Sequence, residues 1–157
     1  MSKNRKNSVN QVVIITQVFY PDTQATSQLL STLATALSNK NELNDLQNTE
    51  VTVLASYPSQ ARGKALKVLS QEQWGDVLIK RGGLAIDSKK SLFHRGLSYI
   101  SYLLWLLFML TFKVHKNSRI LVVTNPPFAP LIVYFAQCLR SLIRSSFSYF
   151  VLLHDIY

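Results

Sequence analysis

The sequence predicts an α/β fold in which a doubly wound, mostly parallel sheet carries helices on both faces. Two short runs, residues 12–15 and 119–124, are almost continuously apolar, as expected of parallel strands buried on both faces. Between such runs lie longer segments with apolar residues at helical spacing, first Leu29, Leu33 and Leu37. Alternating strands and helices are typical of parallel sheets, and 157 residues suit one such domain.

The first ten residues are predicted to be a flexible basic tail, and residues 11–157 to form the domain. The tail carries Lys3, Arg5 and Lys6. The apolar run that follows is shorter than the roughly 7–15 residues of a signal-peptide core, so no secretion signal is predicted. The single cysteine, Cys138, argues against a disulfide framework and favours a reducing, cytoplasmic compartment.

The chain begins with a strand, a polar loop and a helix. Strand 12–15 leads into loop 17–27, and the helix behind it covers the strand with one apolar stripe. The asparagine-rich stretch 39–48 ends the helix, because asparagine favours turns. Residues 51–55, rich in β-branched side chains, are the second predicted strand.

The middle of the chain has the least regular pattern. Residues 60–76 are predicted to be a loop with at most one helical turn. Residues 77–80 are predicted to be the third strand, which Gly82 and Gly83 end. This glycine pair lacks both the GxGxxG spacing and the following helix of a dinucleotide site, so no such site is predicted.

The most apolar segment begins at Leu97 and ends at Phe112. Its sixteen residues fall short of the roughly 20 that a membrane-spanning helix needs, so spanning is not predicted. Two alternatives stay open: a crossover helix of the core with solvated basic ends, and a helix that touches an anionic membrane surface. The basic residues and the histidine that flank it are Lys89, Lys90, His94, Arg95, Lys113 and Lys116.

The last part of the chain reads as strand, break, helix and strand. Strand 119–124 stops at Asn125 and two prolines, because proline cannot continue a central ladder. Helix 128–144 follows, and Cys138 is predicted to pack in the core among its apolar positions. Residues 147–153 are predicted to be the fifth strand.

The charge points to an anionic partner. Seventeen lysines and arginines against eight acidic residues give a net charge of +9, which favours a membrane surface, a nucleic acid or a phosphorylated substrate. A nucleic acid is the least favoured of these. The basic residues are scattered, and the sequence has no helix-turn-helix, zinc or RNA-binding pattern.

The ends of the predicted strands define a candidate site. In the common strand order 3-2-1-4-5, the first, fourth and fifth strands are neighbours, and the carboxyl ends of parallel strands share one edge. Asp22, Asn125, His154 and Asp155 each follow one of these strands. They are therefore predicted to converge in one polar cleft that suits a hydroxyl-rich ligand.

Several segments together resemble the acceptor-side, N-terminal domain of family 4 glycosyltransferases. They are residues 17–22, 25–30, 51–54, 125–127 and 154–157. The resemblance implies a Rossmann-like domain that is one half of a GT-B fold, and retaining transfer from a nucleotide-diphosphate sugar to a glycan or lipid-linked acceptor in cell-surface polysaccharide or glycoconjugate synthesis. It implies neither metal nor cofactor, and adds Gln24, Ala25 and Thr26 as substrate-binding candidates beside the four residues above.

The chain departs from this pattern in two places. Many members have two glycines where Gln24 and Ala25 stand, although a branch with Ala-Thr in this loop is similar. Relatives also continue beyond the position of Tyr157 into a donor-binding domain. The chain is therefore expected to be inactive alone, as a gene fragment or as one subunit of a split enzyme with a separate donor-domain chain. The alternative is a non-catalytic scaffold at the inner face of the membrane.

Overall fold

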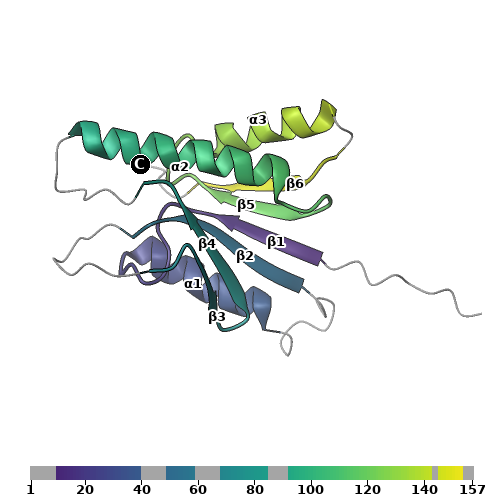
Figure 1. Ribbon diagram of the computed structural model, residues 1–157. Helices are drawn as coiled ribbons and strands as arrows, with labels where there is room; N and C mark the ends of the chain where they lie inside the picture. Colours follow the sequence, from purple (N-terminus) through teal and green to yellow (C-terminus); the bar gives the residue numbers. More distant parts are fainter. Residues whose placement is uncertain (1–9, 40–48, 59–67, 85–91, 143–144, 154–157) are drawn as a thin grey trace, which may run out of the picture.

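In the computed structural model, the described part of the chain forms a six-stranded sheet flanked by three helices (Figure 1). The structure describes residues 10–39, 49–58, 68–84, 92–142 and 145–153. The elements are β1 (Asn10–Ile15), α1 (Ala25–Ser38), β2 (Thr49–Ser56), β3 (Gln71–Trp74), β4 (Val77–Gly82), α2 (Leu92–Phe112), β5 (Arg119–Val123), α3 (Ala129–Leu142) and β6 (Ser148–Leu152). β1 thus begins at Asn10, inside the segment predicted to be a tail.

The strand order is β3-β4-β2-β1-β5-β6. All neighbouring pairs are parallel except β3 and β4, which pair antiparallel at one edge of the sheet. The five strands expected from the sequence correspond to β1, β2, β4, β5 and β6. Their predicted order, 3-2-1-4-5, is confirmed, and the α/β architecture is consistent with a Rossmann-like fold.

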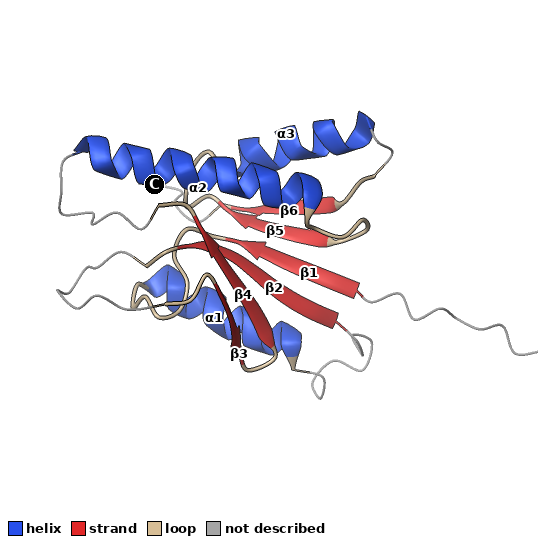
Figure 2. Cartoon of the chain, viewed as in Figure 1, coloured by secondary structure: helices blue, strands red, loops and turns tan. Residues whose placement is uncertain are grey.

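β1 lies at the centre because its side chains are apolar on both faces. Val13, Ile14 and Ile15 have no exposed surface. Ile14 packs with α1 residues on one face, whereas Val13 and Ile15 pack with α2 and α3 residues on the other. Accordingly, α1 covers one face of the sheet, and α2 and α3 cover the opposite face (Figure 2).

β3 corrects the prediction of a loop over residues 60–76. Its sequence, Gln-Glu-Gln-Trp, is too polar to produce an apolar run, yet an edge strand tolerates polar residues because one side of it meets solvent. A two-residue turn joins it to β4, and Gly75 provides the positive φ, 58°, that such turns favour. Residues 59–67 lie outside the described part of the chain.

α2 begins five residues earlier than predicted, at Leu92, and has 21 residues. By length and composition it could cross a membrane, so the expectation that the segment is too short to span was wrong. One stripe of α2, formed by Tyr102, Leu106 and Leu110, is nevertheless fully buried against the sheet.

α3 corrects the prediction for Cys138, whose side chain is exposed. The helix buries Ala129, Val133, Ala136 and Arg140 instead. These residues recur at spacings of four, three and four, which define one face of a helix. Because α3 is also apolar on its outer face, the sequence pattern did not reveal which face turns inward.

Candidate functional site at the carboxyl ends of the strands

The carboxyl ends of β1, β2 and β5 are joined by backbone hydrogen bonds. The amide of Gln17, just beyond β1, donates to the carbonyl of Asn125 at 2.8 Å, and the amide of Ser56 donates to the carbonyl of Gln17 at 3.2 Å. The amide of Thr124 donates to the carbonyl of Leu152 at 3.1 Å, which brings in the end of β6. The predicted alignment of these strand ends along one edge is therefore confirmed.

A buried arginine holds the loop between β1 and α1. The side chain of Arg81 in β4 is 1% exposed, and its Nη2 donates to the carbonyl of Tyr20 at 2.6 Å. The same nitrogen lies 2.7 Å from Oε1 of Glu72 in β3. A buried cation requires such partners. Arg81 thereby ties the loop to both strands of the edge hairpin.

Aromatic packing supports the same loop. The ring of Tyr20 stacks on Trp74 with centroids 5.3 Å apart, and Phe19 meets Trp74 edge-on at 6.0 Å. Sequence reasoning missed both supports, since Trp74 and Glu72 lie in the unpredicted β3. In the sequence, only the position of Arg81, a charged residue between an apolar strand and a glycine pair, could have indicated a buried cation here.

Asp22 occupies the turn at the end of this loop. Its amide donates to the carbonyl of Phe19 at 3.0 Å, so the backbone forms a turn. Its side chain is half-buried, and the buried Oδ2 has no hydrogen-bond partner among the described residues. Burial raises the pKa of Asp22 above its ordinary value of 3.8, and the positive charge of Arg81 offsets part of this rise.

The residues that start α1 differ in accessibility. Gln24 precedes the helix in an extended conformation, and both Gln24 and Ala25 are exposed. Thr26 and Ser27 are buried, and the Oγ of Ser27 has no partner among the described residues. Of the three candidates here, Gln24 and Ala25 are open to a ligand, whereas Thr26 is 7% exposed.

Of the three remaining substrate-binding candidates, the structure describes only Asn125. Asn125 is half-buried, and its backbone is bonded to the loop that carries Asp22. His154 and Asp155 lie outside the described residues, just beyond the end of β6. Within the described part of the chain, no group of three or more His, Cys, Asp or Glu side chains could hold a metal ion.

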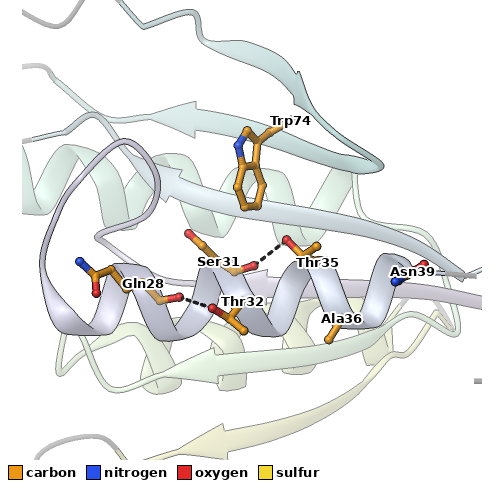
Figure 3. Close-up of a pocket in the computed structure, with 7 residues that line it drawn as sticks. All are labelled: Gln28, Ser31, Thr32, Thr35, Ala36, Asn39 and Trp74. Carbon is orange, nitrogen blue, oxygen red and sulfur yellow. Dashed lines mark hydrogen bonds between the residues drawn. The ribbon is translucent and has the colours of Figure 1, made fainter. Parts of the chain in front are cut away.

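A separate groove runs along α1 beneath Trp74 (Figure 3). Its volume is about 540 Å³, and Gln28, Ser31 and Asn39 contribute to its wall. The hydroxyls of Thr32 and Thr35 donate to helix carbonyls at 3.0 and 2.9 Å, so they stabilise the helix itself. We interpret this groove as the packing seam between α1 and β3.

No protein-family model, no curated protein and no solved structure matches this chain.

Proposed function

We propose that this chain is the acceptor-side domain of a retaining, two-domain glycosyltransferase, that is, the doubly wound Rossmann-like half of a GT-B enzyme. In this proposal the domain binds a hydroxyl of a glycan or lipid-linked acceptor. A nucleotide-diphosphate sugar bound by a second domain donates the sugar. The observation that carries the proposal is Asp22, a half-buried carboxylate in the loop that follows the carboxyl end of the central strand.

The position of Asp22 suits the recognition of a hydroxyl. Burial makes the charged form of this half-buried carboxylate costly, and a ligand hydroxyl that donates to the carboxylate stabilises the charged form. Arg81 and Trp74 hold the loop that carries Asp22 through their contacts with Tyr20. A sugar hydroxyl therefore meets a carboxylate whose loop is already fixed, which lowers the entropy lost on binding.

In the proposed reaction, the acceptor oxygen forms a bond to the anomeric carbon of the donor sugar. The bond from that carbon to the diphosphate oxygen breaks, and the nucleoside diphosphate leaves with the electron pair. The hydroxyl proton passes to the departing phosphate oxygen. Asp22 binds and orients the acceptor hydroxyl, which is a positioning contribution.

The test supplies the second domain. A donor-binding domain from a family 4 glycosyltransferase, fused to the chain or added separately, is assayed for transfer of radiolabelled sugar. We expect no transfer by the chain alone and measurable transfer by the pair. Asp22→Asn should reduce transfer by about 10-fold or more, because a hydrogen bond to a charged group contributes ~1.5–3 kcal/mol.

The matched control is Asp76→Asn, which removes an exposed carboxylate from the turn between β3 and β4. It should leave transfer unchanged. Turnover by the chain alone, or equal activity of Asp22→Asn and the parent pair, would contradict the proposal.

A non-catalytic, membrane-associated scaffold is the second candidate. The observation that favours it is the exposed apolar surface of α2 and α3. It becomes the better account if no donor-binding domain restores transfer while membrane binding is retained.

A further inference from the structure

The two helices on one face of the sheet present apolar side chains outward. On α2 these exposed residues recur at spacings of three or four, and on α3 they do the same. We call this surface the outer face. Its α2 members are Phe93, Leu97, Ile100, Leu104, Phe108 and Phe112. Its α3 members are Leu131, Phe135, Leu139 and Leu142. Monomeric soluble proteins rarely expose contiguous apolar surface on this scale.

Both helices are fixed to the sheet by their opposite sides. The hydroxyl of Tyr102 in α2 lies 2.9 Å from the carbonyl oxygen of Thr16, and Tyr102 is fully buried. Arg140 in α3 donates from Nη1 to the carbonyls of Leu110 and Val114 at 2.8 and 2.7 Å. For α2 to cross a bilayer, these bonds and the core beneath them would have to break. The outer face is therefore suited to lying flat on a membrane.

An apolar groove runs over the outer face between α2 and α3. It has a volume of about 420 Å³ and is lined by Leu104, Leu107, Phe108, Phe112 and Leu139, together with Thr111. The hydroxyl of Thr111 donates to a carbonyl of its own helix at 2.8 Å, so the groove presents no unsatisfied side-chain donor. Such a groove accepts hydrocarbon more readily than a polar ligand.

The charges around the outer face identify its occupant. Residues 88–154 contain no aspartate or glutamate. Exposed basic side chains stand at both ends of α2, with Arg95 near its start and Lys113 and Lys116 just after its end. A second copy of the chain would bring like charges together across a symmetric contact, which is unfavourable. An anionic bilayer offers hydrocarbon to the apolar side chains and negative headgroups to the cations.

We propose that α2 and α3 together form a docking face that lies in the plane of an anionic bilayer. The sequence pointed to the part of α2 from Leu97 onward, and the structure adds the first turn of α2 and the whole outer side of α3. α2 begins at the edge where the strands end, and Ser98 in its second turn donates to the carbonyl of Leu84 at 2.7 Å. Docking therefore brings the strand-end edge close to the lipid headgroups.

Sedimentation with vesicles tests this proposal independently of any sugar transfer. The full chain should bind vesicles of mixed phosphatidylglycerol and phosphatidylcholine, and bind more weakly when salt is raised to about 0.5 M. The double variant Leu104→Gln/Phe108→Gln should weaken binding by at least about 10-fold, because two apolar side chains that would be buried in hydrocarbon become polar. The matched control is Leu29→Gln on α1, which is 56% exposed on the opposite face of the sheet and should bind as the parent does.

Cys138 provides a natural reporter on the outer side of α3. An environment-sensitive fluorophore attached there should shift to the blue when anionic vesicles are added. The control carries the label on α1 instead, in the variant Cys138→Ser/Leu29→Cys, and should not shift.

Three results with the purified protein would overturn the proposal. They are the absence of binding to anionic vesicles, equal binding by Leu104→Gln/Phe108→Gln and the parent, and a dimer that this double variant abolishes without any vesicle binding. Resistance of the cellular protein to high-salt and carbonate extraction would also overturn it, because that result indicates a spanning helix.

Discussion

At the scale of single residues, Asp22 is held where its charge is unfavourable. Burial raises its pKa above 3.8, so between that value and the raised one the folded protein binds more protons than the unfolded chain. The free energy of unfolding therefore contains a contribution that is largest at low pH and declines as the pH rises through the native pKa of Asp22.

The variant Asp22→Asn should lack this decline. Relative to the parent, its free energy of unfolding should increase as the pH rises above 3.8 and become constant above the native pKa of Asp22. Urea denaturation at a series of pH values measures the difference, with Asp76→Asn as the control for removing a surface carboxylate. A difference that does not change with pH would show that burial does not perturb Asp22.

Single residues also show which features of the site can be predicted from the sequence and which cannot. Asp22 could be chosen because it follows an apolar run and a proline, which are local signals. Its partner charge could not be found in this way, since Arg81 is 59 positions away and acts through a buried side chain. The exposure of Cys138 could not be predicted either, because α3 carries apolar residues on both its inner and its outer side.

At the scale of elements, the glycine pair after β4 determines how closely α2 approaches the sheet. A Cβ at Gly82 would overlap the indole of Trp105, and one at Gly83 would lie 2.9 Å from the Cα of Tyr102. Gly83 also has a φ of 86°, which favours glycine. The pair that lacked a dinucleotide pattern therefore has a packing role.

Because a Cβ has no room at Gly82 but has open space at Gly96, glycine-to-alanine changes at these two positions should have opposite effects on stability. Gly82→Ala should destabilise the fold by about 1–3 kcal/mol, because Trp105 must move within a packed layer. Gly96→Ala lies within α2, where an added Cβ meets nothing within 4 Å, and should stabilise it by roughly 0.5–1 kcal/mol. Thermal denaturation of both variants would test the pair. A Gly82→Ala variant as stable as the parent would contradict the close approach of α2.

The elements themselves were predictable to the extent that they are apolar. Strands β1, β2, β4, β5 and β6 each contain an apolar run, and their order followed from the rules of parallel topology. β3 was missed because its stability comes from pairing with β4 and from the packing of Trp74, which are contacts of the folded chain. The early start of α2 was missed because residues 92–96 include a histidine, an arginine and a glycine.

At the scale of the whole molecule, the two faces of the sheet differ in character. Apart from Ala25 and Leu29, the exposed side chains of α1 are hydroxyls and amides, whereas α2 and α3 expose many aliphatic and aromatic side chains. The acidic residues follow the same division, since none occurs between Asp87 and Asp155. The site edge and the docking face are thus built from different parts of one fold, and each can be tested without the other.

Arg140 joins the parts of the docking side into one unit. Its Nη1 binds two carbonyls at the end of α2, its Nη2 donates to the hydroxyl of Ser145 at 2.7 Å, and its guanidinium lies 5.3 Å from the ring centre of Phe147. The carbonyls at the end of a helix have no partner within it, so Arg140 satisfies groups that would otherwise be buried and unpaired. Its contacts link α2, α3 and the segment that enters β6.

Arg140→Met, which fills a similar volume without donors, should therefore lower the free energy of unfolding by about 2–4 kcal/mol. Arg140→Lys should recover only part of this loss, because one ammonium group cannot reach all three acceptors in the geometry of a guanidinium fork. The matched control is Arg119→Met at the exposed start of β5, which should change stability by no more than about 0.5 kcal/mol. Denaturation monitored by circular dichroism gives all three values. If Arg140→Met and Arg119→Met were equally stable, the helix layer and β6 would be held together by apolar packing alone.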